Sequence, residues 1–249
     1  MFPLLYHAHN SRNPEDLPFW LSLAKSAGDP VLELGCGTGR VLLPLARAGR
    51  WVCGVDNDPE MLKFLKEHTP AQLNPLIHIF QADISSFSLG IQFPLIILPC
   101  NTYSILSAEA RLATLKCVHQ HLQPDGAFAL SIPNPILLKR LPRYAEPEIE
   151  EIIPHPVDEE PVEVSSSWAR HKRQFVVTWI YDHLLANGEV ERLTYKVNQF
   201  IIPVEDIDQE FHSAGMQITE RFGDFDRSAF THNSPNLILV AQKAKDRDF

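Results

Sequence analysis

The chain has 249 residues, of which 45% are hydrophobic, and this suits one ordinary domain with an elaboration or two small domains. Its formal charge of -9 has the wrong sign for a large nucleic-acid-binding surface, so we expect no nucleic-acid partner. It has no apolar run of membrane-spanning length, no leader-like N-terminus and no Cys-x-x-Cys pair, so we expect a cytoplasmic protein without membrane contact.

The first half of the chain alternates apolar runs of strand length with segments of helical period, which is typical of parallel βαβ units. Strands are predicted at residues 30–35, 51–56, 77–83, 95–100 and 128–132. Helices are predicted at 40–49, 59–68 and 109–122, and QPDGA at 123–127 is predicted as a turn. These elements predict an open, doubly wound α/β sheet, which binds ligands at the carboxyl ends of its strands.

The pattern changes beyond residue 133. Residues 146–163 carry eight acidic side chains, four prolines and no lysine or arginine, which favours a solvated connector over the edge of a functional lid. Residues 175–184 alternate, Asn187-Gly188 favours a type I′ turn, and 190–202 is the expected partner strand. A helix at 204–215 and strands at 216–223 and 236–244 complete the chain.

Two regions are therefore expected. Residues 1–136 and 204–249 form a ligand-binding α/β domain, and residues 137–203 form an inserted antiparallel layer. The layer is predicted to act as a lid, to bind a substrate or to pair two subunits into a homodimer.

The stretch VLELGCGTGR at 31–40 contains three glycines that suit a tight turn from strand to helix. Arg40 stands where the dinucleotide pattern has its third glycine, and this weakens a dinucleotide interpretation. Glu33 would repel a diphosphate but suits a cationic group such as an α-amine. The stretch therefore favours a ligand without phosphates.

Two further acids stand at predicted strand ends. Asp56 is placed to accept both hydroxyls of a ribose, and Asp83 to accept from the exocyclic amine of a base while Ile84 covers its ring. Each aspartate alone could simply cap the following helix. Three acids at the ends of three successive strands favour a nucleoside-binding site.

These residues resemble the class I S-adenosylmethionine-dependent methyltransferases. VLELGCGTGR resembles the first motif of that family, VCGVDNDPEML the second, QADI the third, and LQPDGAFAL the loop and fifth strand. The resemblance implies a Rossmann-like sheet of seven strands with the last strand antiparallel, and S-adenosylmethionine as cofactor. Asn101-Thr102-Tyr103 lacks the Asn-Pro-Pro-Tyr signature of methylases that act on nucleic-acid bases.

The resemblance also implies the site residues. The methionine part is expected at the glycine turn, the ribose at Asp56, and the adenine at the ends of the second and third strands. The expected cofactor-binding residues are Glu33, Gly35, Cys36, Gly37, Gly39, Asp56, Asn57, Met61, Asp83, Ile84, Pro99 and Asn101.

Methyl transfer to a nitrogen or oxygen atom of a small-molecule acceptor, by in-line displacement, is the expected activity. No decisive general base is visible; the catalytic candidates are Tyr6, Tyr103 and His155. Aromatic side chains are the substrate candidates: Phe19, Trp20, Tyr103, Trp168, Trp179, Tyr181 and Tyr195. No metal site is predicted, because His119 and His121 lie on different faces of one predicted helix.

Two alternatives remain open. A non-catalytic protein that binds S-adenosylmethionine for regulation would have the same motifs. A nicotinamide-dependent oxidoreductase would share the fold and Asp56, but Arg40 and the Asp83-Ile84 pair argue against it.

Overall fold

A computed structural model describes residues 2–12 and 14–245. The chain divides into two compact units, which are described separately. The larger unit comprises the described residues of Glu15–Leu137 and Ile202–Phe249, and the smaller unit those of Met1–Pro14 and Leu138–Ile201. No helix in the described part of the chain is long and apolar enough to cross a membrane.

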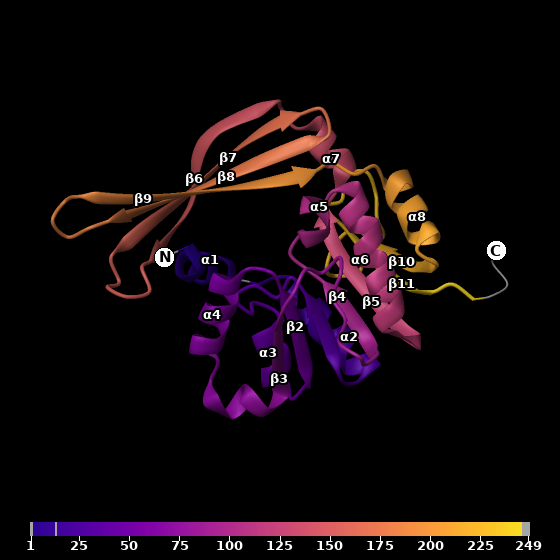
Figure 1. The fold of residues 1–249 in the computed structure, drawn as a ribbon. Helices are drawn as coiled ribbons and strands as arrows, with labels where there is room; N and C mark the ends of the chain where they lie inside the picture. The colour runs from indigo at the N-terminus through magenta and orange to yellow at the C-terminus, as the bar shows by residue number, and fades with distance from the viewer. Residues whose placement is uncertain (1, 13, 246–249) are drawn as a thin grey trace. The chain divides into compact units, whose positions relative to one another are not determined.

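A seven-stranded sheet forms the centre of the larger unit (Figure 1). In sheet order its strands are β10 (Met216–Phe222), β11 (Asn236–Lys243), β5 (Leu122–Pro133), β4 (Phe93–Leu98), β1 (Val31–Leu34), β2 (Val52–Asp56) and β3 (Ile77–Gln81). The pairs from β5 to β3 are parallel, whereas β11 is antiparallel to both of its neighbours. The predicted seven-stranded fold with an antiparallel last strand is confirmed.

Helices follow most strands of this unit. They are α2 (Leu17–Ala27), α3 (Leu42–Arg47), α4 (Pro59–His68), the 3-10 helix η1 (Ala71–Leu76), α5 (Thr102–Ile105), α6 (Ala108–His121), α7 (Pro135–Arg140), which crosses into the smaller unit, and α8 (Val204–Ser213). Local sequence sets their starts. The Asp58 carboxylate caps α4 by accepting from the N–H groups of Glu60 and Met61, and Ser107 caps α6 in the same way.

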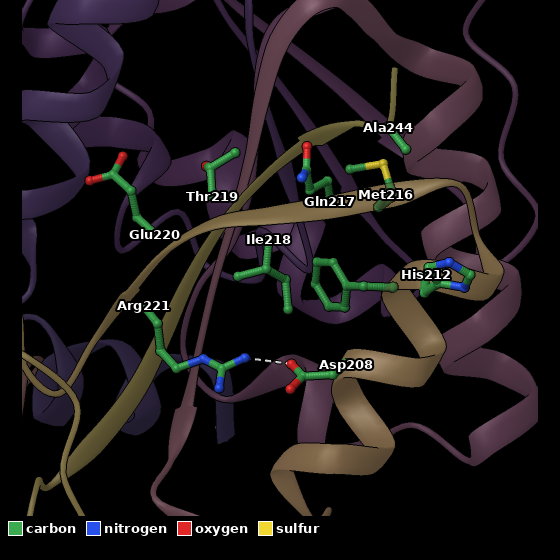
Figure 2. A pocket seen from close by; sticks show the side chains of 10 residues that line it. Asp208, His212, Met216, Gln217, Ile218, Thr219, Glu220, Arg221 and Ala244 are labelled. Carbon is green, nitrogen blue, oxygen red and sulfur yellow. Dashed lines mark hydrogen bonds and ion pairs between the residues drawn. The ribbon is translucent and has the colours of Figure 1, made fainter. Parts of the chain in front are cut away.

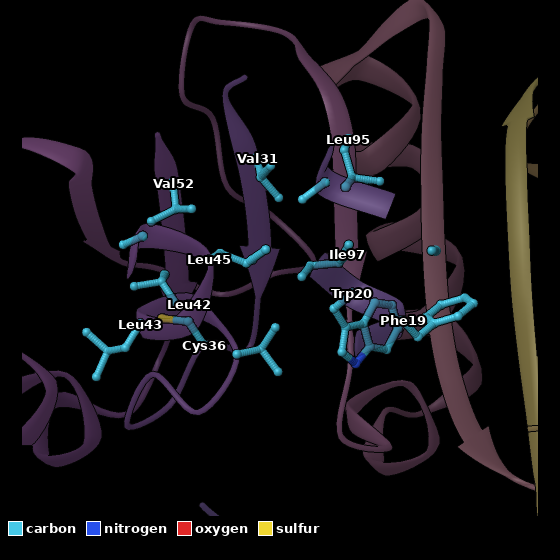
Figure 3. Packing of buried hydrophobic residues seen from close by; sticks show 14 of the residues in the cluster. Phe19, Trp20, Val31, Cys36, Leu42, Leu43, Leu45, Val52, Leu95 and Ile97 are labelled. Atoms are coloured by element: carbon cyan, nitrogen blue, oxygen red, sulfur yellow. The ribbon is translucent and has the colours of Figure 1, made fainter. Parts of the chain in front are cut away.

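One buried cluster packs α2, α3 and α4 against the parallel strands (Figure 3). Trp20 of α2 and Leu42 and Leu45 of α3 are completely buried, and each such side chain contributes about 1.5–3 kcal/mol of hydrophobic free energy. A Cβ on Gly54 in β2 would lie 2.6 Å from Leu42 Cδ1, so this glycine permits the close approach of α3. The cluster thereby packs the helices tightly against the parallel strands.

The smaller unit is a four-stranded antiparallel sheet in the order β6 (Tyr144–Pro154), β7 (Pro161–His171), β8 (Gln174–Leu184) and β9 (Val190–Phe200). The helix α1 (Phe2–Asn10) belongs to this unit. Its Leu5 is buried in one cluster with Ile153, Val162 and Val164. The antiparallel layer was predicted, but the packing of α1 against it was not, because residues 1–136 were expected to lie with residues 204–249 in the other domain.

Three local predictions are wrong. The acidic segment 146–163 is not a connector, because most of it lies in β6 and β7. In β6 only Ile153 is buried, so the sequence of this strand lacks the apolar pattern from which a strand is predicted. The turn at Asn187-Gly188 is not type I′, because Gly188 alone has positive φ, at +86°. Residues 123–127 (QPDGA) lie within β5 and not in a turn. They interrupt the pairing with β4, since Phe93 pairs with Leu122 and Leu95 pairs with Ala127.

Candidate functional site

The turn after β1 is built from glycines in left-handed conformations. Gly35, Gly37 and Gly39 have φ values of +67°, +49° and +84°. A Cβ on Gly35 would lie 2.9 Å from Thr102 Cγ2, and one on Gly39 would lie 2.5 Å from Leu65 Cδ1, so packing forbids a side chain at either position. A Cβ on Gly37 would meet nothing closer than 4.0 Å, so bare backbone borders open space there.

Glu33 lies in β1 just before this turn and is 3% exposed. Its Oε2 is buried without a hydrogen-bond partner among the described residues. Burial raises the pKa of this carboxyl well above its usual value, although the charge of Arg40 acts in the opposite direction. A buried acceptor with nothing to accept is costly, so the site is suited to a ligand that donates hydrogen bonds or carries positive charge.

Asp56 ends β2 and is tied to the glycine turn. Its Oδ2 accepts from the N–H of Gly37 at 2.7 Å, and its Oδ1 accepts from the N–H of Asp58 at 2.9 Å. Burial raises the pKa of the Asp56 carboxyl, while these two hydrogen bonds lower it. Each oxygen keeps a second lone pair, so the carboxylate can also accept from two ligand hydroxyls.

The chain after β3 presents Asp83 and Ile84. Asp83 is exposed, and its Oδ1 accepts from the N–H and Oγ of Ser85 at 2.8 and 2.7 Å, which lowers the pKa of the carboxyl. Ile84 is buried. After β2, Asn57 is exposed and Met61 lies buried on α4. Because β1, β2 and β3 are adjacent and parallel, these residues follow the same edge of the sheet as the glycine turn.

The end of β4 completes this edge. Pro99 is followed by Cys100 and Asn101, which both have left-handed backbones, with φ of +59° and +62°. Such conformations are unusual for residues other than glycine, and they concentrate at functional sites. Burial raises the pKa of the Cys100 thiol to about 11, so it is a neutral thiol near pH 7.

Arg40 has a role that sequence reasoning missed. Its guanidinium binds both oxygens of the buried Asp16, and its Nη2 lies 2.9 Å from Cys100 Sγ. Trp20 Nε1 donates to Asp16 Oδ2 at 2.9 Å. Arg40 therefore fastens α2, the glycine turn and the end of β4 to one another. The sequence feature that could have indicated this role is the positively charged Arg40 at the position where the dinucleotide-binding pattern has its third glycine.

Three aromatic candidates of the larger unit are core residues. Phe19, Trp20 and Tyr103 are at most 2% exposed. The Tyr103 hydroxyl donates to Glu210 Oε2 at 2.5 Å, and Arg111 binds the same carboxylate. A role of these rings in substrate binding or catalysis stays a prediction. Their burial argues against it, because buried rings cannot contact a substrate.

Four aromatic candidates lie in the smaller unit. Tyr181 is buried and its hydroxyl lies 3.1 Å from His9 Nδ1, whereas Trp179 is half-buried with the His9 ring against it. Tyr195 is 40% exposed. The indole nitrogen of Trp168 is buried without a partner among the described residues.

The remaining catalytic candidates also lie in the smaller unit. Tyr6 is on α1, with its ring 5.6 Å from that of Phe2. His155 follows β6 and is buried against His183, a residue that sequence reasoning did not select because it is 28 positions away in another strand.

A cavity of about 570 Å³ lies elsewhere, along α8 and the edge strand β10 (Figure 2). Phe211, Met216 and Ile218 supply apolar walls, and Arg221 binds Asp208 at its border. Three strands separate β10 from β1 in the sheet, so this cavity is not the site at the glycine turn.

Comparison with known proteins identifies the class. Residues 31–126 match the family described as a methyltransferase domain, and this range contains the glycine turn, Asp56 and Asp83. Residues 31–126 are therefore a methyltransferase domain, and this match, the seven-stranded fold and the relatives support a class I S-adenosylmethionine-dependent methyltransferase, as the motif resemblance implied.

Particular relatives agree with that class. The putative methyltransferase YqeM of Bacillus subtilis (strain 168) is 23% identical over 231 residues, which are 91% of this chain and 89% of that protein. An S-adenosylmethionine-dependent methyltransferase structure from Clostridium acetobutylicum has a TM-score of 0.82 at 16% identity, covering 98% of this chain and 99% of that one. The sugar N-methyltransferase KedS8 from Streptoalloteichus sp has a TM-score of 0.76 at 17% identity, covering 98% and 93%. The two structural likenesses show a shared fold.

Proposed function

We propose that this methyltransferase transfers the methyl group of S-adenosylmethionine to a nitrogen or oxygen atom of a small molecule by in-line displacement. The observation that carries the proposal is the buried Glu33 Oε2, which has no hydrogen-bond partner among the described residues and precedes a glycine turn with bare backbone at Gly37. A cofactor with an amino-acid part supplies the missing cationic donor.

The larger unit has the groups for the whole cofactor. Glu33 accepts from the α-ammonium group, and the backbone at Gly37 borders the methionine part. Asp56 accepts from the ribose hydroxyls with its remaining lone pairs. Asp83 Oδ2 accepts from the adenine amine, and the apolar side chain of Ile84 contacts the ring. Cys36, Asn57, Met61, Pro99 and Asn101 are proposed as further contacts.

When bound, S-adenosylmethionine supplies a methyl group on a sulfonium centre. The task of the protein is to hold donor and acceptor in line and to keep water out, and such orientation can account for most of the rate. The closely packed glycine turn and the Arg40–Asp16 pair suit this positioning role. An amine acceptor must also lose its proton before it attacks. We assign no side chain to that step.

Nitrogen is the favoured acceptor atom. The support is the likeness to KedS8, a sugar N-methyltransferase, and to a glycopeptide N-methyltransferase. We propose that the smaller unit selects the acceptor, with the exposed Tyr195 and the half-buried Trp179 as recognition residues. A Tyr195→Ala variant is expected to raise the KM for the acceptor and to leave cofactor affinity within about twofold. If it instead dissociates a dimer, the pairing role of the layer is the correct one.

Two measurements test the proposal. Isothermal titration is expected to show binding of S-adenosylmethionine and S-adenosylhomocysteine, with no binding of NADH; the reverse result refutes the assignment of the site. Methyl-labelled cofactor is then incubated with matched amines and alcohols, such as amino sugars and their hydroxyl counterparts. Label on amines supports N-methylation and label on alcohols alone supports O-methylation. Cofactor binding without transfer across a broad panel favours the regulatory alternative.

A further inference from the structure

Two histidines and an aspartate meet in the smaller unit, at the end of the four-stranded sheet where β6 turns into β7. His155 directly follows β6, Asp158 lies in the turn, and His183 lies on β8 opposite Val162 of β7. The turn itself is well fixed. The N–H of His155 donates to the Glu160 carbonyl at 2.8 Å, and the N–H of Glu160 donates to Asp158 Oδ1 at 3.1 Å. The three side chains are therefore brought together by the fold and not by closeness in sequence.

Their geometry matches a metal-binding set. Asp158 Oδ1 lies 2.9 Å from His155 Nδ1 and 3.2 Å from His183 Nε2, and one ligand atom from each residue falls within a 4.8 Å span. Neighbouring ligand atoms around a tetrahedral Zn²⁺ are about 3.3 Å apart, from bond lengths near 2.0–2.1 Å. Small side-chain rotations thus suffice to seat an ion among the three.

The second nitrogen of His183 supports the same interpretation. His155 Nε2 and His183 Nδ1 are buried without hydrogen-bond partners, and the two rings stack with centroids 3.9 Å apart. Glu191 Oε2 lies 3.9 Å from His183 Nδ1. If His183 Nε2 binds a metal, the proton moves to Nδ1 and faces this carboxylate, which is the usual orientation of a metal-binding histidine. His155 Nε2 gains no partner from this change.

The surroundings favour a cation and give it access. The two histidine side chains are 8% and 6% exposed, but Asp158 is 42% exposed, so the cluster is open to water on one side. Residues 146–163 have eight acidic side chains and no basic one, and the resulting negative potential raises the local concentration of cations.

We propose that His155, Asp158 and His183 bind one divalent transition-metal ion, with Zn²⁺ as the best match, and that water completes its coordination. Two imidazoles and one carboxylate are ligands suited to zinc and to its neighbours in the first row. The ion ties the β6–β7 turn to β8 and so stabilises the smaller unit. This site is separate from the cofactor residues of the larger unit, and it does not depend on the proposed acceptor.

The test uses the full chain without an affinity tag, stripped of metal and kept reduced. Equilibrium dialysis with Zn²⁺ is expected to give one ion per chain, and saturating Zn²⁺ is expected to raise the melting temperature. Asp158→Asn keeps the size of a partly exposed side chain and is expected to weaken Zn²⁺ binding at least tenfold and to remove the thermal shift. Glu159→Gln removes the same charge one position away and is the matched control, expected within twofold of wild type.

Co²⁺ provides a second measurement. Its visible absorption is expected to show nitrogen and oxygen ligands in the wild type and to be lost in His183→Ala. If that variant does not fold, Asp158→Asn decides the question. The proposal is overturned if no Zn²⁺ binds, if Asp158→Asn binds as tightly as Glu159→Gln, or if Co²⁺ shows thiolate charge-transfer bands that assign the metal to cysteines.

Discussion

Replacement of Glu33 by glutamine separates a binding role from a structural one. The change keeps the shape of the side chain and removes its charge. A hydrogen bond to a charged group contributes about 1.5–3 kcal/mol, so cofactor affinity is expected to fall about 10- to 150-fold. Stability without cofactor is expected to stay equal or to rise, because ionised Glu33 is buried, its Oε2 is unpartnered, and its raised pKa shows that folding disfavours the charge.

Isothermal titration with S-adenosylhomocysteine and thermal unfolding without ligand measure the two effects. The control is Glu67→Gln, which removes the same charge from an exposed position on α4 of the same unit. Affinity within twofold of the control would show that Glu33 does not bind the amino group. A large loss of stability in Glu33→Gln would show that the carboxylate has a structural partner, contrary to the unpartnered oxygen found here.

The other predictions concern the same edge of the sheet. The raised pKa of Glu33 means that cofactor affinity is fully present above that pKa and declines as pH falls through it, measurable by titration at several pH values. The free energy of unfolding of the cofactor-free protein changes with pH in the opposite direction, because the folded state binds the Glu33 proton more tightly than the unfolded chain does. The stability that this proton contributes is fully present below the pKa of Glu33 in the unfolded chain. It is lost as pH rises through the pKa of Glu33 in the folded protein. Asp56→Ala is expected to weaken cofactor binding by about 1.5–3 kcal/mol, and an unchanged Kd would remove its ribose role. Arg40→Met leaves the buried Asp16 without its positively charged partner, so denaturant unfolding is expected to show a loss of about 3–5 kcal/mol in the free energy of unfolding. Adding Asp16→Asn is expected to recover part of this loss. A loss below about 1 kcal/mol would show that the Arg40–Asp16 pair does not fasten α2 to the glycine turn.

Much of the larger unit could be predicted because its signals are local. Apolar runs of strand length mark β1 and β2, and Pro59 with Asp58 marks the start of α4. Strand ends place Asp56 beside the glycine turn, and the structure has them joined by a hydrogen bond to Gly37. Parallel pairing of adjacent strands then brings distant side chains to one edge without any long-range information.

The remaining features depend on contacts that no local pattern encodes. β6 is an edge strand whose side chains are almost all exposed, so its sequence is that of a solvated segment and pairing with β7 alone makes it a strand. Tyr103 follows a strand end, as functional residues often do, yet its hydroxyl meets Glu210 from a helix 107 positions away. His155 and His183 likewise become neighbours only through the register of β7 and β8.

The division of the chain into its units has a consequence for anyone who dissects the protein. The backbone passes from one unit to the other three times, after residues 14, 137 and 201, so no single cut yields either unit as one continuous piece. Deleting 138–201 would strip the apolar side of α1 of its partners, because Leu5 packs with residues of β6 and β7. A fragment limited to the larger unit must therefore begin near Glu15 and rejoin Leu137 to Ile202, whereas removing α1 alone would uncover the sheet that it covers.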